Sequence, residues 1–170
     1  MGQLVLRIKD LSNLPEIVLP EGYGIHTARL DSKRVWEKII ESSFDMHEDF
    51  DVKMDRPNLT RDRIFFVEIE GVDVATCCFY DHWDYQGEAF LHMLATKKEA
   101  SRKGAGKLAL VATLRKVRSM GYESAVLTTD DFRVSALRLY LDLGFRPVID
   151  TEETEARWEA IYKELGKRYV

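Results

Sequence analysis

The sequence predicts a mixed α/β fold, in which a largely antiparallel, twisted sheet is flanked by helices. Two observations support this class. Apolar, strand-like runs follow one another between residues 63 and 96, separated only by turns and loops, which is typical of antiparallel hairpins. From residue 89 onward, strand-like and helix-like segments alternate. Early hairpins followed by this alternation favour one mixed sheet with helices on its faces.

Length and composition fit a single domain over residues 1–170. With 45% hydrophobic and 32% charged residues, the 170-residue chain can bury a core without disulfides or metal. The net charge of −4 argues against a dedicated nucleic-acid binder. Cys77 and Cys78 are adjacent in an apolar run, which predicts packed, reduced thiols. Neither a signal-like segment nor an apolar stretch of about 20 residues is visible, so we expect a cytoplasmic protein without membrane contact.

The first two elements are predicted to be strands. Apolar and polar residues alternate over 4–10, and a second strand-like run covers 25–30. A loop rich in proline and glycine separates them. The segment 4–10, as an edge strand, could pair across a homodimer.

A helix is predicted next, over residues 32–44. Asp31 and Ser32 can cap its start. Its apolar stripe contains Val35, Trp36, Ile39 and Ile40. Residues 45–62 are polar and irregular, with room for one short helix.

The rest of the chain supplies the hairpins and the alternating segments. Gly71 lies in a turn between two strand-like runs, and Gly121 and Gly144 suit the ends of two amphipathic helices. The expected strands are 63–70, 74–80, 89–96, 124–129 and 146–149. The expected helices run from the glycine loop to about Met120, from Arg133 to Leu143, and over 153–165.

A loop with two glycines among cations, SRKGAGKLAL, precedes the helix that ends near Met120. Gly104 and Gly106 permit close backbone approach, and the N–H groups at a helix start favour a phosphate. The same pattern is equally consistent with a plain strand-to-helix turn. The P-loop motif fails because Ser101 replaces its first glycine and Leu108 follows Lys107. A dinucleotide fingerprint fits only loosely, with an alanine in its last position. No strand-to-acidic-residue pattern supports it, because the next strand ends in Thr128, Thr129 and Asp130.

Two motifs together resemble the GNAT superfamily of acyl-coenzyme A-dependent N-acyltransferases. The family loop [QR]-x-x-G-x-[GA] corresponds to Ser101, Arg102, Lys103, Gly104, Ala105 and Gly106. The second signature, A-x-x-L-Y-x-x-x-G-F, corresponds with every spacing kept to Ala136, Leu139, Tyr140, Gly144 and Phe145. The resemblance covers residues 23–150 and implies the acetyltransferase fold of that family.

This sequence departs from the family pattern at three positions. Ser101 stands where the family prefers Gln or Arg, and Arg102 stands where a further glycine is common. Arg102 could restore the charge that faces the pyrophosphate. Arg133 stands where many members have an asparagine that makes the usual side-chain contact to the pantetheine arm.

The resemblance implies acetyl-CoA as cosubstrate and an amine as acceptor. The strand ending at Leu94, Ala95 and Thr96 would splay from its neighbour and bind the pantetheine amides through its backbone. The N–H groups from Arg102 to Lys107 would hold the pyrophosphate. The amine would attack the thioester directly, a backbone N–H near Leu94 would stabilise the oxyanion, and Tyr140 would protonate the thiolate.

The residues leave the general base and the acceptor pocket open. His92 lies on a strand face near the expected centre, although a lone histidine in a strand is more often structural. Asp81, His82 and Asp84 could receive a cationic amine or could form a solvated turn. Five aromatic residues could line the pocket or belong to the core: Trp36, Phe44, Phe50, Trp83 and Tyr85. No pair of Cys or His residues has metal-ligand spacing, so we expect no metal site.

Three functions compete at this stage. An N-acetyltransferase acting on a small amine or a protein is favoured by the intact Tyr140. A non-catalytic acetyl-CoA sensor is the alternative, kept open by Ser101 and Arg133. A nucleotide-binding α/β domain is the third, and it would prefer a mononucleotide over coenzyme A.

Overall fold

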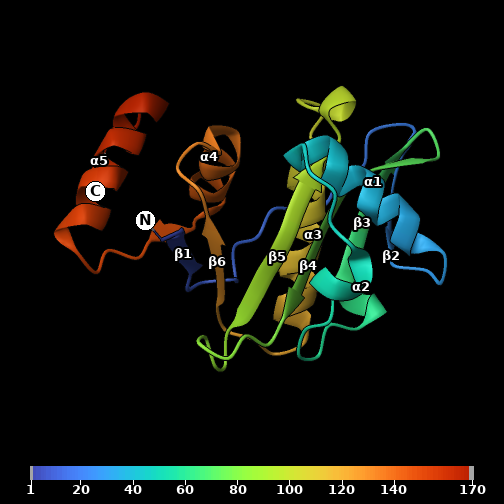
Figure 1. Cartoon of the computed structure of the whole chain (residues 1–170), viewed down its shortest axis with the longest axis horizontal. Coiled ribbons are helices and arrows are strands. Elements are labelled where there is room, and N and C mark those ends of the chain that lie inside the picture. The colour runs from blue at the N-terminus through green and yellow to red at the C-terminus, as the bar shows by residue number, and fades with distance from the viewer. Residues whose placement is uncertain (1, 169–170) are drawn as a thin grey trace.

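The computed structural model describes residues 2–168, and its centre is a seven-stranded sheet with the order β2-β3-β4-β5-β6-β1-β7 (Figure 1). Every neighbouring pair is antiparallel except β5 and β6, which are parallel. The strands are β1 Leu4–Ile8, β2 Tyr23–Thr27, β3 Ile64–Ile69, β4 Val72–Tyr80, β5 Ala89–Thr96, β6 Ala125–Thr129 and β7 Arg146–Pro147. The α-helices are α1 Ser32–Phe44, α2 Phe50–Lys53, α3 Ala105–Ser119, α4 Val134–Leu143 and α5 Glu152–Leu165.

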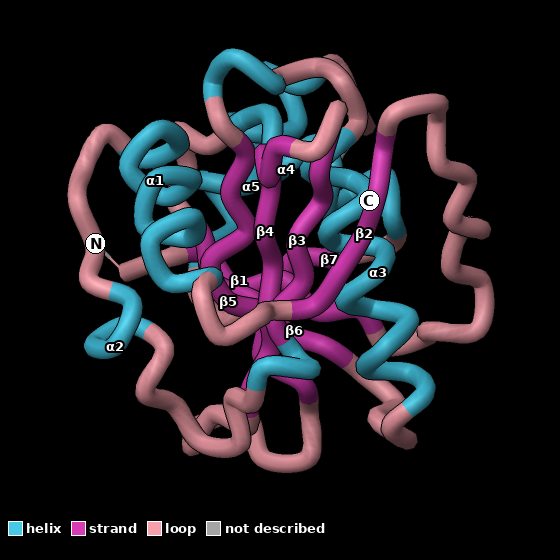
Figure 2. The backbone as a smooth tube through the Cα atoms, turned by 90° about the vertical axis from the view of Figure 1, so that its right-hand side faces the viewer, coloured by secondary structure: helices cyan, strands magenta, loops and turns pink. Residues whose placement is uncertain are grey.

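Helices α1 and α3 cover opposite faces of the sheet (Figure 2). Strand β4 explains this arrangement, since successive side chains of a strand point to opposite faces. Cys77 joins the core cluster that contains residues of α3, α4 and α5, and Cys78 joins the cluster that contains residues of α1. The continuous apolar run of β4 is therefore buried on both sides. Both cysteines are buried free thiols, and burial raises the pKa of Cys77 to about 12, so it stays a protonated, unreactive thiol.

The sheet opens between β5 and β6. These strands pair only near their starts, at Ala89 with Ala125 and at Phe90 with Val126. Beyond this point they diverge, and Figure 1 shows the gap widening toward the carboxyl ends of both strands. Ligands of open α/β sheets bind at the carboxyl ends of strands, where neighbouring strands separate.

Most of the predicted elements are confirmed. The helix over 32–44, the hairpin around Gly71 and the strand over 89–96 form as expected. Asp31 lies at the N-cap of α1, but its side chain makes no capping hydrogen bond; instead the Ser32 hydroxyl accepts from the N–H of Arg29 at 2.8 Å. Strand β2 begins and ends earlier than predicted, because its register follows β3.

The expectation that residues 4–10 form an edge strand was wrong. Strand β1 lies between β6 and β7 and is hydrogen-bonded on both sides, so it cannot pair with a second chain. The short final strand β7 occupies the edge instead. Within residues 2–168, none of the helices combines the length and the apolar character needed to cross a membrane.

Candidate active site

A β-bulge near the end of β5 turns the backbone of this strand toward the opening between β5 and β6. Thr76 of β4 faces Ala95, and Cys78 faces His92, so two residues of β5 lie opposite Cys77 alone. Met93, the first of these two, has a φ of 55°, which is rare for a residue with a side chain. The bulge turns the following residue, Leu94, out of the regular ladder, and its backbone borders the opening between β5 and β6.

The glycine loop forms the start of α3. Arg102 and Gly104 both have positive φ, at 62° and 78°, and the helix begins at Ala105. The first N–H groups of a helix have no acceptor within the helix, and the N-cap residue Gly104 supplies no side-chain acceptor. These N–H groups are therefore available to an anion.

Gly106 is required for a different reason from Gly104. A Cβ at Gly106 would lie 2.8 Å from the hydroxyl oxygen of Thr96, whereas a Cβ at Gly104 would meet nothing within 4 Å. Gly106 therefore lets α3 approach the end of β5, and Gly104 supplies the backbone conformation.

Loop and strand together enclose a pocket of about 490 Å³, called here the loop pocket. Every predicted cosubstrate residue except Lys103 lines it. These residues are Leu94, Ala95, Thr96, Ser101, Arg102, Gly104, Ala105, Gly106, Lys107 and Arg133. Lys103 lies outside this set because it lines a neighbouring pocket beside the loop at Pro15–Pro20, and its carbonyl accepts from the Tyr23 hydroxyl at 2.8 Å.

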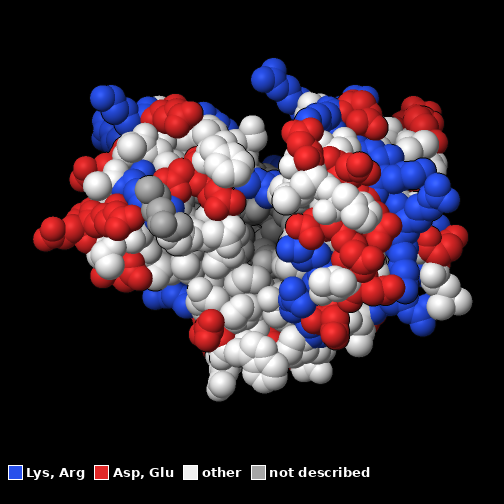
Figure 3. Space-filling view, viewed as in Figure 1, with Lys and Arg blue, Asp and Glu red and all other residues white. Residues whose placement is uncertain are grey.

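A second pocket of about 270 Å³, called here the central pocket, lies where β5 and β6 diverge. Figure 3 shows the molecule hollowed between its two lobes. Both Tyr140 and His92 line the central pocket. Leu94 and Arg133 line both pockets, so the loop pocket leads into the central one.

Tyr140 carries a buried hydroxyl that keeps its proton at neutral pH. The residue is 6% exposed, and burial, with a smaller contribution from Cys77, raises the pKa of Tyr140 well above its usual value, while Arg133 opposes this. Helix α4 places Tyr140 on its buried face with Leu137 and Leu141. A protonated phenol beside the gap is suited to giving a proton to a leaving group.

His92 is neutral at physiological pH. Burial lowers the pKa of His92 to about 4, although its hydrogen bond to the Lys53 carbonyl works in the opposite direction. That bond joins Nε2 to the carbonyl oxygen at 3.2 Å, and because a carbonyl only accepts, Nε2 carries the proton. Nδ1 is then the nitrogen with a lone pair. The same low pKa makes it a weak base.

The stability of the protein should fall as the pH drops from about 6.5 to about 4, because the unfolded chain protonates this imidazole and the native state does not. Above pH 6.5 the contribution is constant. The full loss is on the order of 3 kcal/mol. Urea unfolding at several pH values should show a shallower dependence in His92→Gln than in the wild type, and equal slopes would contradict the assignment.

Arg133 joins the two sides of the gap. It lies at the N-cap of α4, and its guanidinium carbon stacks over the ring of Phe44, at the end of α1, 4.2 Å from the centroid. The contact spans from the β6 side of the opening to the β5 side. Arg133 therefore contacts Phe44 across the opening between β5 and β6, and it lines both the loop pocket and the central pocket.

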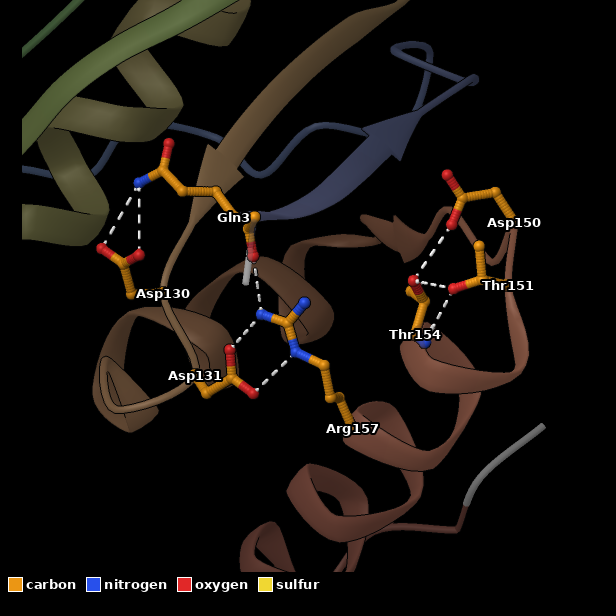
Figure 4. Close-up of polar contacts among 8 residues, drawn as sticks. Gln3, Asp130, Asp131, Asp150, Thr151, Thr154 and Arg157 are labelled. Atoms are coloured by element: carbon orange, nitrogen blue, oxygen red, sulfur yellow. Dashed lines mark hydrogen bonds and ion pairs between the residues drawn. The ribbon is translucent and has the colours of Figure 1, made fainter.

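The loop that carries Arg133 is held by the last helix. Arg157 of α5 binds the Asp131 carboxylate through two nitrogens, at 3.1 and 2.5 Å, and donates to the Gly2 carbonyl at 2.9 Å (Figure 4). Gln3 donates to the Asp130 carboxylate at 3.3 Å in the same view. The chain start and α5 thereby fix the segment between β6 and α4.

Removing the Arg157–Asp131 ion pair should affect catalysis as well as the stability of the fold. Arg157→Ala is expected to cost about 1 kcal/mol of unfolding free energy, because the ion pair is partly exposed. It should also lower any catalytic efficiency about tenfold by loosening the Arg133 segment. The matched control is Lys167→Ala, which removes a 2.6 Å ion pair to Asp142 of α4 that does not touch this segment. Equal catalytic losses in both variants would contradict the positioning role.

Asp81, His82 and Asp84 lie outside the central pocket, and His82 lines a separate pocket with Trp83. Asp81 accepts hydrogen bonds from Asn58 and from the Tyr122 hydroxyl, so it serves packing. The ring of His82 contacts three aromatic rings, and the Asp84 side chain is largely exposed. None of the three lines the central pocket.

Of the five aromatic residues suggested for the acceptor pocket, only Phe44 lines the central pocket. Trp36 is fully buried in the core under α1 and contacts Phe50 edge to face. Trp83 is 75% exposed, and Tyr85 packs on Phe90.

Sequence reasoning missed the carboxylates that do line the central pocket, Glu48 and Asp130. Asp130 directly follows β6, so its place at a strand end was the available signal. Glu48 lies in the irregular segment before α2 and pairs with Lys53 at 3.2 Å. No pattern in that segment points to it.

Comparison with known families decides the classification of this geometry. The model of the acetyltransferase (GNAT) family matches residues 30–145, which include both β5 with its bulge and the glycine loop. The chain belongs to the GNAT acetyltransferase family. Among curated proteins, none matches the sequence closely enough to count as a relative.

Solved structures show the same fold. GCN5-related N-acetyltransferases from Kribbella flavida and Sphaerobacter thermophilus superpose with TM-scores of 0.62 and 0.68, at 21% and 18% identity. They are matched over 86% and 87% of this chain but only 55% and 50% of their own, so the chain spans about half their length. The ribosomal-protein-S18-alanine N-acetyltransferase from Escherichia coli has a TM-score of 0.63 at 17% identity, over 75% of this chain and 79% of that one. At these identities the likeness concerns the fold.

Proposed function

We propose that this GNAT protein transfers an acetyl group from acetyl-CoA to an amine, in a complex that holds both substrates at once. One observation carries the proposal. The loop pocket, with its helix-start N–H groups, meets the central pocket, with its buried Tyr140, at Leu94 and Arg133. A phosphate-bearing donor in one pocket would thus place its thioester beside an acceptor in the other.

The loop pocket suits the donor chemically. The N–H groups of Ala105, Gly106 and Lys107 would bind the pyrophosphate, with the positive end of the α3 dipole behind them. Arg102 and Lys107 would add charge to the same pocket. The end of β5, unpaired toward β6, would bind the pantetheine amides as an added strand does.

The reaction would form one N–C bond and break one C–S bond. The amine attacks the thioester carbonyl, and the oxyanion accepts from the backbone N–H of Leu94, a type of donor worth roughly 2.7–4 kcal/mol where measured. Tyr140 gives its proton to the departing thiolate. The proton that leaves the amine passes to water or to Nδ1 of His92, and the tyrosinate recovers a proton from solvent.

The experiment that tests the proposal measures thiol release from acetyl-CoA with a panel of polyamines, amino acids and peptides, with mass spectrometry of the product. Release that depends on one amine, with a product heavier by one acetyl group, is the expected result. Binding of acetyl-CoA without turnover by any amine would favour the sensor function instead. An absence of both binding and turnover would contradict both functions.

A further inference from the structure

A separate cluster of polar side chains lies on β2, β3 and β4, on the opposite side of β5 from β6. His26, Glu68 and Asp73 place one ligand-type atom each within 4.8 Å of one another. The His26 ring stacks on Phe66, with centroids 5.4 Å apart and planes 10° apart, which fixes its orientation. Phe66 belongs to the core cluster under α1, so the three residues share that face of the sheet. None of them lines the loop pocket or the central pocket.

Both nitrogens of His26 face acceptors. Nδ1 lies 2.8 Å from the Thr27 carbonyl oxygen, and Nε2 lies 2.7 Å from a carboxylate oxygen of Asp73. These two contacts fix the ring so that Nε2 points toward Asp73 and Nδ1 points toward a backbone carbonyl. A metal ion at Nε2 would leave the Nδ1 N–H donating to that carbonyl, which is the arrangement typical of metal-binding histidines.

The two carboxylates are also placed against each other. Glu68 and Asp73 are direct partners across β3 and β4, where like charges destabilise a sheet. Glu68 cannot turn away easily, because its side chain lies across Gly24 on the neighbouring strand. A Cβ at Gly24 would be 2.7 Å from the Glu68 carboxylate oxygen. The missing side chain at residue 24 thus makes room for Glu68 to lie beside His26.

We propose that His26, Glu68 and Asp73 bind a divalent cation of the Zn²⁺ class. Imidazole nitrogen and carboxylate oxygen are both ligand types that bind Zn²⁺ in proteins, and water would fill the remaining position. The cation would lie between Nε2 and the carboxylates and would neutralise the two opposed negative charges. The side chains of His26 and Asp73 are 13% and 17% exposed, so the ion is shielded but reachable.

The site would brace the edge strand β2. Among residues 2–168, β2 pairs only with β3. The hydroxyl of its first residue, Tyr23, donates to the Lys103 carbonyl in the glycine loop. A cation that links β2 to β3 and β4 would therefore also stabilise the position of the glycine loop, through Tyr23. This role is structural and does not depend on acetyl transfer.

The test is a calorimetric titration of the EDTA-treated full chain with Zn²⁺, combined with thermal unfolding with and without the metal. We expect one equivalent to bind and to raise the unfolding temperature. The double variant Glu68→Gln with Asp73→Asn should weaken binding by more than about tenfold, the smallest loss typical even of outer-shell partners. His26→Gln should weaken binding likewise.

The matched control is Glu70→Gln, a carboxylate two residues farther along that lies against Gly22. It should leave Zn²⁺ binding unchanged. The proposal is overturned if the wild type takes up no Zn²⁺, or if uptake survives in the double variant, which would place the ion elsewhere. NMR signals of the His26 ring that do not change when Zn²⁺ is added would also overturn the proposal.

Discussion

Replacing Gly104 by tryptophan is expected to weaken acetyl-CoA binding by more than about 100-fold. Gly104 is the N-cap of α3, with φ at 78°, and it lines the loop pocket. A residue with a side chain is strained there by roughly 1–3 kcal/mol, which would turn the helix-start N–H groups away from the phosphates. The open space around the position also allows the indole to occupy the pocket.

Calorimetric titration with acetyl-CoA measures this effect, and Gly121→Trp is the matched control. Gly121 follows the other end of α3, has φ at 90°, and would also present its Cβ to open space. Its replacement carries the same kind of backbone strain but lies far from the loop pocket. We expect wild-type affinity in the control. Equal losses in both variants would mean that the strain of α3, and not the loop, explains the change.

Replacing Tyr140 by phenylalanine is expected to lower the turnover number about 10²–10⁴-fold while acetyl-CoA affinity stays within about twofold. The magnitude is that of losing a positioned general acid. The buried phenol keeps its proton over the working range because its pKa is raised. Removing one oxygen leaves the packing of Tyr140 against Phe145 intact, so the fold should be preserved.

Steady-state kinetics and direct acetyl-CoA binding, measured on the same preparations, separate a loss of turnover from a loss of affinity. Tyr162→Phe is the control, since Tyr162 is also buried and also has a raised pKa but lies on α5, away from both pockets. Its turnover number should match the wild type. If Tyr140→Phe retains full turnover, the thiolate is protonated by another group or by water.

The sequence predicted the helices and strands correctly where local residue patterns are enough to specify them. The apolar stripe of residues 32–44 and the glycine at position 71 each specify an element without help from the rest of the chain. The place of β1 in the middle of the sheet did not follow, because strand order depends on long-range pairing with β6 and β7. An alternating strand looks the same at an edge and in the interior.

The site was predictable where backbone geometry requires a residue type. Glycine at positions 104 and 106 and the spacing around Tyr140 indicated the loop pocket and one wall of the central pocket. Glu48 was not predictable, because its position depends on how an irregular segment folds over β5. The His26 cluster was also missed, since its three members come from three strands and share no spacing.

Amide hydrogen exchange with and without acetyl-CoA tests the central claim most directly, because it reports on the backbone groups that are assigned to the donor. The N–H groups of Ala105, Gly106 and Lys107 should exchange fast in the free protein and slow markedly when acetyl-CoA binds, together with those of Leu94 to Thr96. The strands β2 and β3 should be nearly unchanged. Protection confined to other segments, or none at saturating acetyl-CoA, would contradict the assignment of the loop pocket to the donor.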